Sequence, residues 1–210
     1  MAKKNKKPVY DCIVFIVEGD ADELIMRKLI DYYRQRGWQP KQSIDYYNVH
    51  GFPTEKKIKQ KLTGLQQTKN DNEIKFSTVC CEFDTDVLTV NRQFDEPDWR
   101  GIERGIKDRF PVEHFCLVKA KSSIEDWMLD DIDGLLRALI LPLTTKVTGA
   151  TGQEKVASLF RKKNIKYDRM KGKASIEKYI NALDIEKIRI SRKKELSSLE
   201  KALGINRILK

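Results

Sequence analysis

Five carboxylates stand just after apolar segments, in positions from which they could meet at a single site. They are Glu18, Asp22, Asp84, Asp86 and Glu125. Carboxylates at such positions repel one another and raise one another's pKa, and a divalent cation relieves that repulsion. Because the set contains no His or Cys, its hard oxygen ligands favour Mg²⁺ or Mn²⁺. One or two such ions can hold both the attacking and the leaving oxygen of a phosphoryl displacement.

Each acidic group also has a structural explanation when it is taken alone. Asp22 and its acidic neighbours suit the first turn of a helix, where they offset the helix dipole, and Glu125 suits the same position in a later helix. Asp84 and Asp86 fit an Asx-type turn. The hypothesis of a shared site therefore depends on the three groups following three separate strands at the same edge of one sheet.

The segments that would position the acids alternate between strand and helix. Short apolar, β-branched runs predict strands over 9–17, 43–49, 75–83 and 114–118. Apolar residues at helical spacing predict helices over 20–36, 54–67, 99–109 and 123–140. This fourfold alternation is typical of an α/β fold with a mostly parallel sheet flanked by helices. In such sheets, functional groups gather beyond the carboxyl ends of the strands, where the five acids fall.

The chain is expected to divide into four parts. Residues 1–8 form a basic tail, 9–141 the catalytic α/β domain, 142–152 a Thr- and Gly-rich linker, and 153–210 a basic helical extension. Within the extension, helices are expected over 153–163, 174–183 and 192–203.

The excess of positive charge is confined to the C-terminal part. The net charge is +10, yet residues 1–150 hold 24 basic and 24 acidic residues, whereas residues 151–210 hold 17 basic and 7 acidic ones. This asymmetry indicates a polyanionic partner such as nucleic acid, although a solubilising pair of basic helices would show the same pattern. The lysines expected to contact phosphates are Lys162, Lys163, Lys171, Lys193 and Lys194.

At the acidic positions the sequence resembles the Toprim (topoisomerase–primase) superfamily. That superfamily has Glu-Gly after its first strand and Asp-x-Asp after its third, and here Glu18-Gly19 and Asp84-x-Asp86 occupy those places. The resemblance covers residues 9–141 and implies that Glu18, Asp22, Asp84, Asp86 and Glu125 hold the metal, with Glu18, Asp84, Asp86 and Glu125 also acting in catalysis.

Within Toprim proteins the chain is most similar to the OLD-type and RloB-like nucleases. Glu18-Gly-x-x-Asp22 resembles their Glu-Gly-x-x-Glu with Asp at the second acid, and Ser123-x-Glu125-x-Trp127 resembles the start of one of their helices. The similarity implies cleavage of DNA or RNA in an anti-phage or toxin-like system. It also implies a catalytic lysine downstream of the acids, for which Lys171 and Lys173 are the best candidates and Lys119 and Lys121 are others. Lys173 is the one assigned to catalysis here, and the similarity implies an ABC-type ATPase partner as well. The chain has no P-loop, so that ATPase would be a separate subunit.

An alternative function is a non-catalytic nucleic-acid-binding or regulatory subunit that retains a degenerate Toprim core. The four cysteines lie in apolar runs without metal-ligand spacing, which indicates buried thiols and a reducing, cytoplasmic compartment. No segment is long and apolar enough to span a bilayer, so no membrane partner is expected. Homo-oligomer formation stays open.

Overall fold

The computed structural model describes residues 9–68, 73–86, 96–168 and 173–209. In chain order its elements are β1 (Val9–Val17), α1 (Asp20–Gln35), β2 (Ser43–Asn48), α2 (Glu55–Thr68), β3 (Glu73–Asp84), α4 (Trp99–Lys107), β4 (Val112–Ala120), α5 (Ile124–Leu129), α6 (Ile132–Ala138), α7 (Gly152–Arg161), α8 (Lys173–Asn181), α9 (Ile185–Ser191), α10 (Lys193–Ala202) and the 3-10 helix η1 (Ile205–Arg207).

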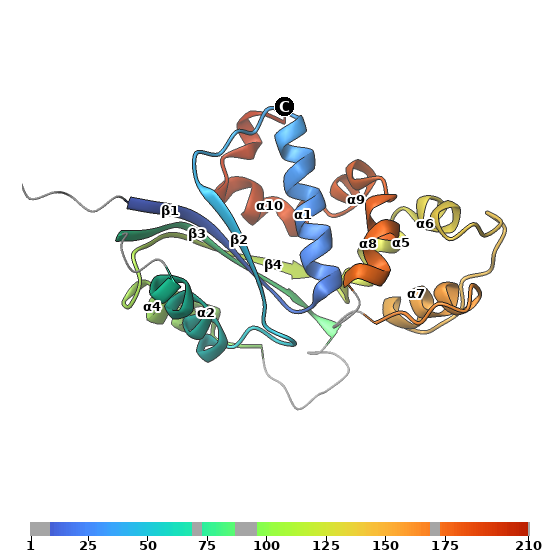
Figure 1. The fold of residues 1–210 in the computed structure, drawn as a ribbon, viewed down its shortest axis with the longest axis horizontal. Helices are drawn as coiled ribbons and strands as arrows, with labels where there is room; N and C mark the ends of the chain where they lie inside the picture. The colour runs from blue at the N-terminus through green and yellow to red at the C-terminus, as the bar shows by residue number, and fades with distance from the viewer. Residues whose placement is uncertain (1–8, 69–72, 87–95, 169–172, 210) are drawn as a thin grey trace, which may run out of the picture.

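The four strands form one sheet in the order β2-β1-β3-β4, and every neighbouring pair is parallel. The α/β fold class with a parallel sheet flanked by helices is therefore confirmed. β1 and β3 are the two central strands, and their carboxyl ends lie side by side (Figure 1). Glu18, which follows β1, and Asp84, the last residue of β3, therefore meet at the middle of one edge of the sheet.

The sheet separates two hydrophobic cores, and β1 contributes to both. Ile13, Phe15 and Val17 face one core, whereas Cys12, Val14 and Ile16 face the other, as the period-two alternation of a strand requires. This explains why residues 12–17 of β1 are an uninterrupted apolar run: a parallel strand covered by helices on both sides needs apolar residues wherever both of its faces are buried.

The two faces of the sheet are covered very differently (Figure 1). One face carries α2 and α4, whereas the other carries α1 together with α5–α10. The helices after residue 150 share a single core with α1, to which they contribute Phe160, Ile180, Ile188 and Leu199. The basic C-terminal part of the chain is therefore helical and packs on the α/β core itself.

The expectation of one helix over 123–140 is wrong, because the chain forms two short helices, α5 and α6, that break at Asp130–Asp131. The side chain of Asp131 folds over Gly134, where a Cβ atom would lie 1.9 Å from its Oδ2. The same carboxylate accepts hydrogen bonds from the Asp184 N–H and from Lys187 Nζ. These tertiary contacts at the break were not visible in the helical spacing.

The C-terminal helices also differ from the expectation in one respect. Helix α9 was not predicted, although Asp184 caps its N-terminus by accepting hydrogen bonds from the backbone N–H groups of Glu186 and Lys187. Across the described residues, none of the helices has the length and apolar character needed to cross a bilayer.

Candidate metal centre

The acidic residues reach the carboxyl edge of the sheet from strands and from helix starts. Glu18 follows β1, Asp84 is the last residue of β3, and Asp22 lies in the first turn of α1. Glu125 lies in the first turn of α5, which follows β4. The side chains of Asp22, Asp84 and Glu125 are completely buried, and Glu18 is 4% exposed. Four of the five candidate acids therefore lie at one edge of the sheet.

A one-residue bulge in β3 decides which face of the sheet the acids join. Cys12 of β1 pairs with Phe76, but the next residue, Ile13, pairs with Thr78, so Ser77 is the extra residue. Before the bulge Phe76 faces the α2/α4 core, and after it Cys80 faces the α1 core. Because side chains alternate along a strand, the bulge turns the even-numbered residues that follow it toward α1.

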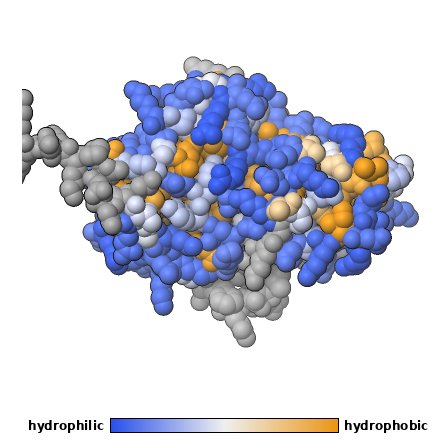
Figure 2. Space-filling view, viewed as in Figure 1, coloured by the Kyte–Doolittle hydropathy of each residue, from blue (hydrophilic) through white to orange (hydrophobic). Residues whose placement is uncertain are grey.

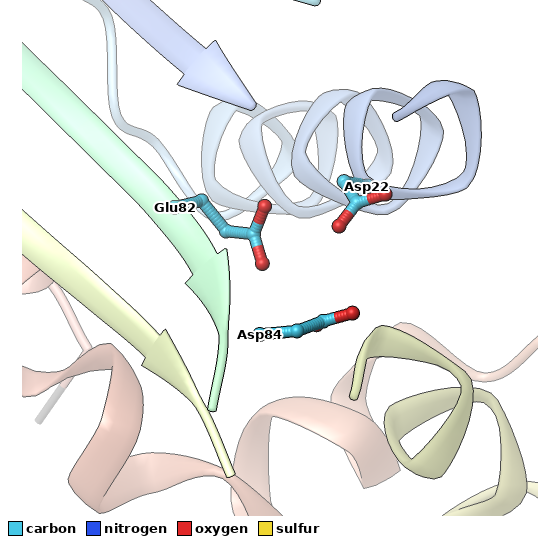
Figure 3. Close-up of side chains that lie close together, drawn as sticks. All are labelled: Asp22, Glu82 and Asp84. Atoms are coloured by element: carbon cyan, nitrogen blue, oxygen red, sulfur yellow. The ribbon is translucent and has the colours of Figure 1, made fainter. Parts of the chain in front are cut away.

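Glu82 and Asp84 are two of these even-numbered residues, and they meet Asp22 of α1 (Figure 3). One carboxylate oxygen from each of the three lies within 4.8 Å of the others. Two ligands on opposite sides of one Mg²⁺ ion are about 4.2 Å apart, since each Mg–O distance is about 2.1 Å. The three carboxylates therefore fit a single cation after small side-chain rotations.

The electrostatics of Glu82 are set by its burial and by the acids around it. Burial, followed by the negative charges of Asp22, Asp84 and Glu18, raises the pKa of Glu82 well above its ordinary value. Within the described ranges, neither carboxylate oxygen of Glu82 has a hydrogen-bond partner, although both are inaccessible to solvent. A buried carboxylate surrounded by other acids is costly unless a cation binds, so the donor set fits a hard divalent ion.

Glu18 and Glu125 extend the cluster on its two sides. Glu18 Oε1 accepts a hydrogen bond from the backbone N–H of Asp84 at 3.2 Å. Asp84 Oδ1 accepts one from the backbone N–H of Ile124 at 2.8 Å, which places the start of α5 directly beside Asp84. Glu125 Oε1 accepts a hydrogen bond from the Tyr167 hydroxyl at 2.9 Å. The donors in these three contacts are neutral, so they orient the carboxylates without cancelling their charge.

The backbone around the site is held in unusual conformations at two strand ends. His50, after β2, has a φ of 50°, and Ser122, after β4, has a φ of 66°. Non-glycine residues adopt the left-handed region at a cost that the surrounding structure must offset. Next to these residues, the Gly51 N–H donates to the Glu18 carbonyl oxygen, and the Asp86 N–H donates to the Ser122 carbonyl oxygen, both at 2.9 Å.

The acids predicted as metal ligands differ in how close they lie to the three-carboxylate cluster. Asp22 and Asp84 lie in the three-carboxylate cluster, and Glu18 and Glu125 lie beside Asp84. Asp86 lies two residues beyond the end of β3 and is partly exposed, outside the set of three.

Lys173 lies at the start of α8, against the N-terminal end of α1. Its backbone N–H donates to Asp20 Oδ2, and its Nζ lies 2.6 Å from Glu23 Oε1. Burial acts to raise the pKa of Glu23, but the hydrogen bonds and charges of Lys173 and Arg27 outweigh it and lower that pKa. The ammonium group is therefore held by the residue that follows Asp22.

Four of the other candidate lysines lie at the ends of α7 and α10. Lys162 and Lys163 follow α7, and Lys193 and Lys194 begin α10, all four with exposed side chains. The two helices lie apart in Figure 1. Lys171 lies outside the described residues.

Two residues of the site were missed in the sequence. Glu82 precedes Asp84 by two positions, a spacing that places both on one face of a strand, and this signal was present in the sequence. Tyr167 follows Glu125 by 42 residues and has no motif that marks it.

Comparison with known protein families, with curated proteins and with solved structures finds no match to this chain. The case for a function is therefore built on the chemistry of the site and on the resemblance in the sequence.

Proposed function

We propose that this chain is a Mg²⁺- or Mn²⁺-dependent nuclease that cleaves phosphodiesters of DNA or RNA. The observation that carries the proposal is the completely buried cluster of Asp22, Glu82 and Asp84 at the carboxyl edge of the sheet. Glu18 and Glu125 border this cluster, so the residues present could hold one or two ions. Such an ion supplies charge stabilisation to a phosphoryl group during its displacement.

In this proposal each group of residues has a separate role. The five carboxylates Glu18, Asp22, Glu82, Asp84 and Glu125 bind and orient the cation. Lys173, whose side chain is 40% exposed and paired with Glu23, would contact a phosphate from the side of α1. The exposed lysines after α7 and at the start of α10 would add contacts to the nucleic-acid backbone, whose phosphates supply most of the affinity in such complexes.

The wider context of the proposal comes from the sequence resemblance. It supports a role as the effector of an anti-phage or toxin-like system, with an ABC-type ATPase as a separate subunit.

The test of this function combines metal binding with cleavage. The full chain is titrated with Mn²⁺ by calorimetry and melted with and without the ion, and it is then incubated with supercoiled plasmid and with RNA. At a Mn²⁺ concentration of 100 times the dissociation constant, the free energy of unfolding should rise by about 2.7 kcal/mol. For a chain of this length, that rise corresponds to roughly 5–10 °C in the melting temperature.

Asp84→Asn is the informative variant, because its amide oxygen can still accept the Ile124 N–H. It should remain folded, lose the stabilisation by Mn²⁺ and cleave at least about 10²-fold more slowly. Asp133→Ala removes an exposed acid of α6 and should change neither result. A wild-type chain that binds Mn²⁺ but cleaves neither nucleic acid would favour the non-catalytic binding subunit. One that does neither would refute the metal centre.

A further inference from the structure

The connection between α7 and α8 brings Tyr167 to the edge of the acidic cluster. Its hydroxyl donates to Glu125 Oε1 at 2.9 Å and lies 3.8 Å from Met128 Sδ. Its ring packs on Phe160 of α7, with 5.1 Å between the ring centroids. The aromatic ring is thus held by packing, whereas the hydroxyl contacts a site residue.

The residue that Tyr167 contacts is closely tied to the three-carboxylate cluster. Glu125 is completely buried and begins α5, and the preceding residue, Ile124, donates its backbone N–H to Asp84 Oδ1 at 2.8 Å. A hydrogen bond to one oxygen of a carboxylate restricts rotation about the terminal side-chain bond, which otherwise has a broad preference. The direction in which Glu125 presents its oxygens is therefore set in part by a residue from the C-terminal helical region.

We propose that Tyr167 is a positioning residue of the metal centre, which acts through Glu125. This inference rests on the proposed metal site and deepens it, because it makes the C-terminal helices part of the site. The hydroxyl is neutral, so it orients the carboxylate and leaves its negative charge for the cation. Hydrogen-bonding partners of metal ligands typically contribute 10- to 100-fold to metal affinity, and Tyr167 has this relation to Glu125.

The experiment compares two tyrosines that pack on the same phenylalanine. Tyr167→Phe removes the hydroxyl that contacts Glu125, whereas Tyr179→Phe removes the hydroxyl of a buried ring whose centroid is 4.9 Å from that of Phe160. Among the described residues, the Tyr179 hydroxyl makes no hydrogen bond to a site acid. Calorimetric titration should show Mn²⁺ binding weakened by about tenfold in Tyr167→Phe and unchanged in Tyr179→Phe.

A second measurement separates positioning from a general structural role. In a Glu125→Ala background the contact between the Tyr167 hydroxyl and the Glu125 carboxylate is already absent, so adding Tyr167→Phe should not weaken Mn²⁺ binding further. Equal losses in both backgrounds, or an unchanged dissociation constant in Tyr167→Phe, would overturn the inference while leaving the metal centre intact. A wild-type chain that fails to bind Mn²⁺ would refute the metal centre itself, and the inference with it.

Discussion

Buried carboxylates occur in two regions of the molecule, and their surroundings differ. The first region is the helical layer formed by α1 and α5–α10. There Glu200 is 3% exposed and accepts hydrogen bonds from Nε and Nη2 of Arg189, at 2.6 and 3.1 Å. The Tyr33 hydroxyl donates to the same carboxylate at 2.8 Å. At the sheet edge, Glu82 is equally buried, but the charges that act on it come from Asp22, Asp84 and Glu18.

The pKa values express the same difference. Burial acts to raise the pKa of Asp131 in the helical layer, but hydrogen bonds from the Asp184 N–H and from Lys187 outweigh burial and lower it. At Glu82, burial and the neighbouring acids all raise the pKa. Asp131 and Glu200 are thus paired with cationic side chains of the chain itself, whereas the charges that act on Glu82 are negative and raise its pKa.

The largest effect on stability is expected from breaking the pair in the helical layer. Arg189→Met leaves the charge of Glu200 buried without its cation and should reduce the free energy of unfolding by about 3–5 kcal/mol, measured by urea denaturation. Arg34→Met is the matched control, since the Arg34–Asp31 pair is about half exposed and should contribute less than about 0.5 kcal/mol. If both variants lose equally little free energy of unfolding, the buried Glu200 carboxylate does not need Arg189 for the stability of the fold. Restored stability in the double variant Arg189→Met/Glu200→Met would confirm the cause.

At the sheet edge, by contrast, a substitution is expected to raise the free energy of unfolding. Glu82→Gln removes a buried charge from among like charges, so the metal-free chain should gain about 0.5–2 kcal/mol of unfolding free energy at neutral pH. The same variant should bind Mn²⁺ more weakly than the wild type. A variant that is less stable than the wild type without metal would mean that the repulsion at the site is already compensated.

The gain in Glu82→Gln should depend on pH. Below the ordinary pKa of 4.5, Glu82 is protonated in both the folded and the unfolded chain and contributes no difference. As the pH rises above this value, the unfolded chain releases the proton first, so the wild type loses stability relative to the variant until the pH passes the raised folded pKa. Asp131→Asn should show the reverse trend, because the lowered pKa of Asp131 stabilises the chain at neutral pH and that stabilisation is lost in acid. Urea denaturation from about pH 2 to pH 8 measures both, because the stabilisation by Asp131 is lost only below its ordinary pKa of 3.8.

Exposed lysines should have the smallest effect on stability and a clear effect on binding. Replacing Lys162, Lys163, Lys193 and Lys194 by Gln should change the free energy of unfolding by less than about 0.5 kcal/mol per site. The same change should flatten the dependence of log affinity for nucleic acid on log salt by up to about 4 units. The control replaces four exposed lysines elsewhere, namely Lys41, Lys56, Lys107 and Lys146. An equal change of slope in the control would show that total charge matters and the location does not.

Local patterns in the chain were enough to predict the α/β fold and the edge of the sheet at which the acids meet. The apolar runs before Glu18 and Asp84 mark buried parallel strands, because such strands need apolar residues on both faces. Parallel strands end at a common edge, so acids placed after them converge whatever the details of packing.

The membership of the site was decided by tertiary structure. The bulge at Ser77 sets the face on which Glu82 and Asp84 lie, and an extra residue in a ladder depends on the partner strand β1 and leaves no periodic signal. Tyr167 contacts Glu125 across 42 residues because α7 packs on the same core as α1. Spacing along the chain reports which residues share a strand or a helix face, whereas contacts between distant segments depend on how the helices pack.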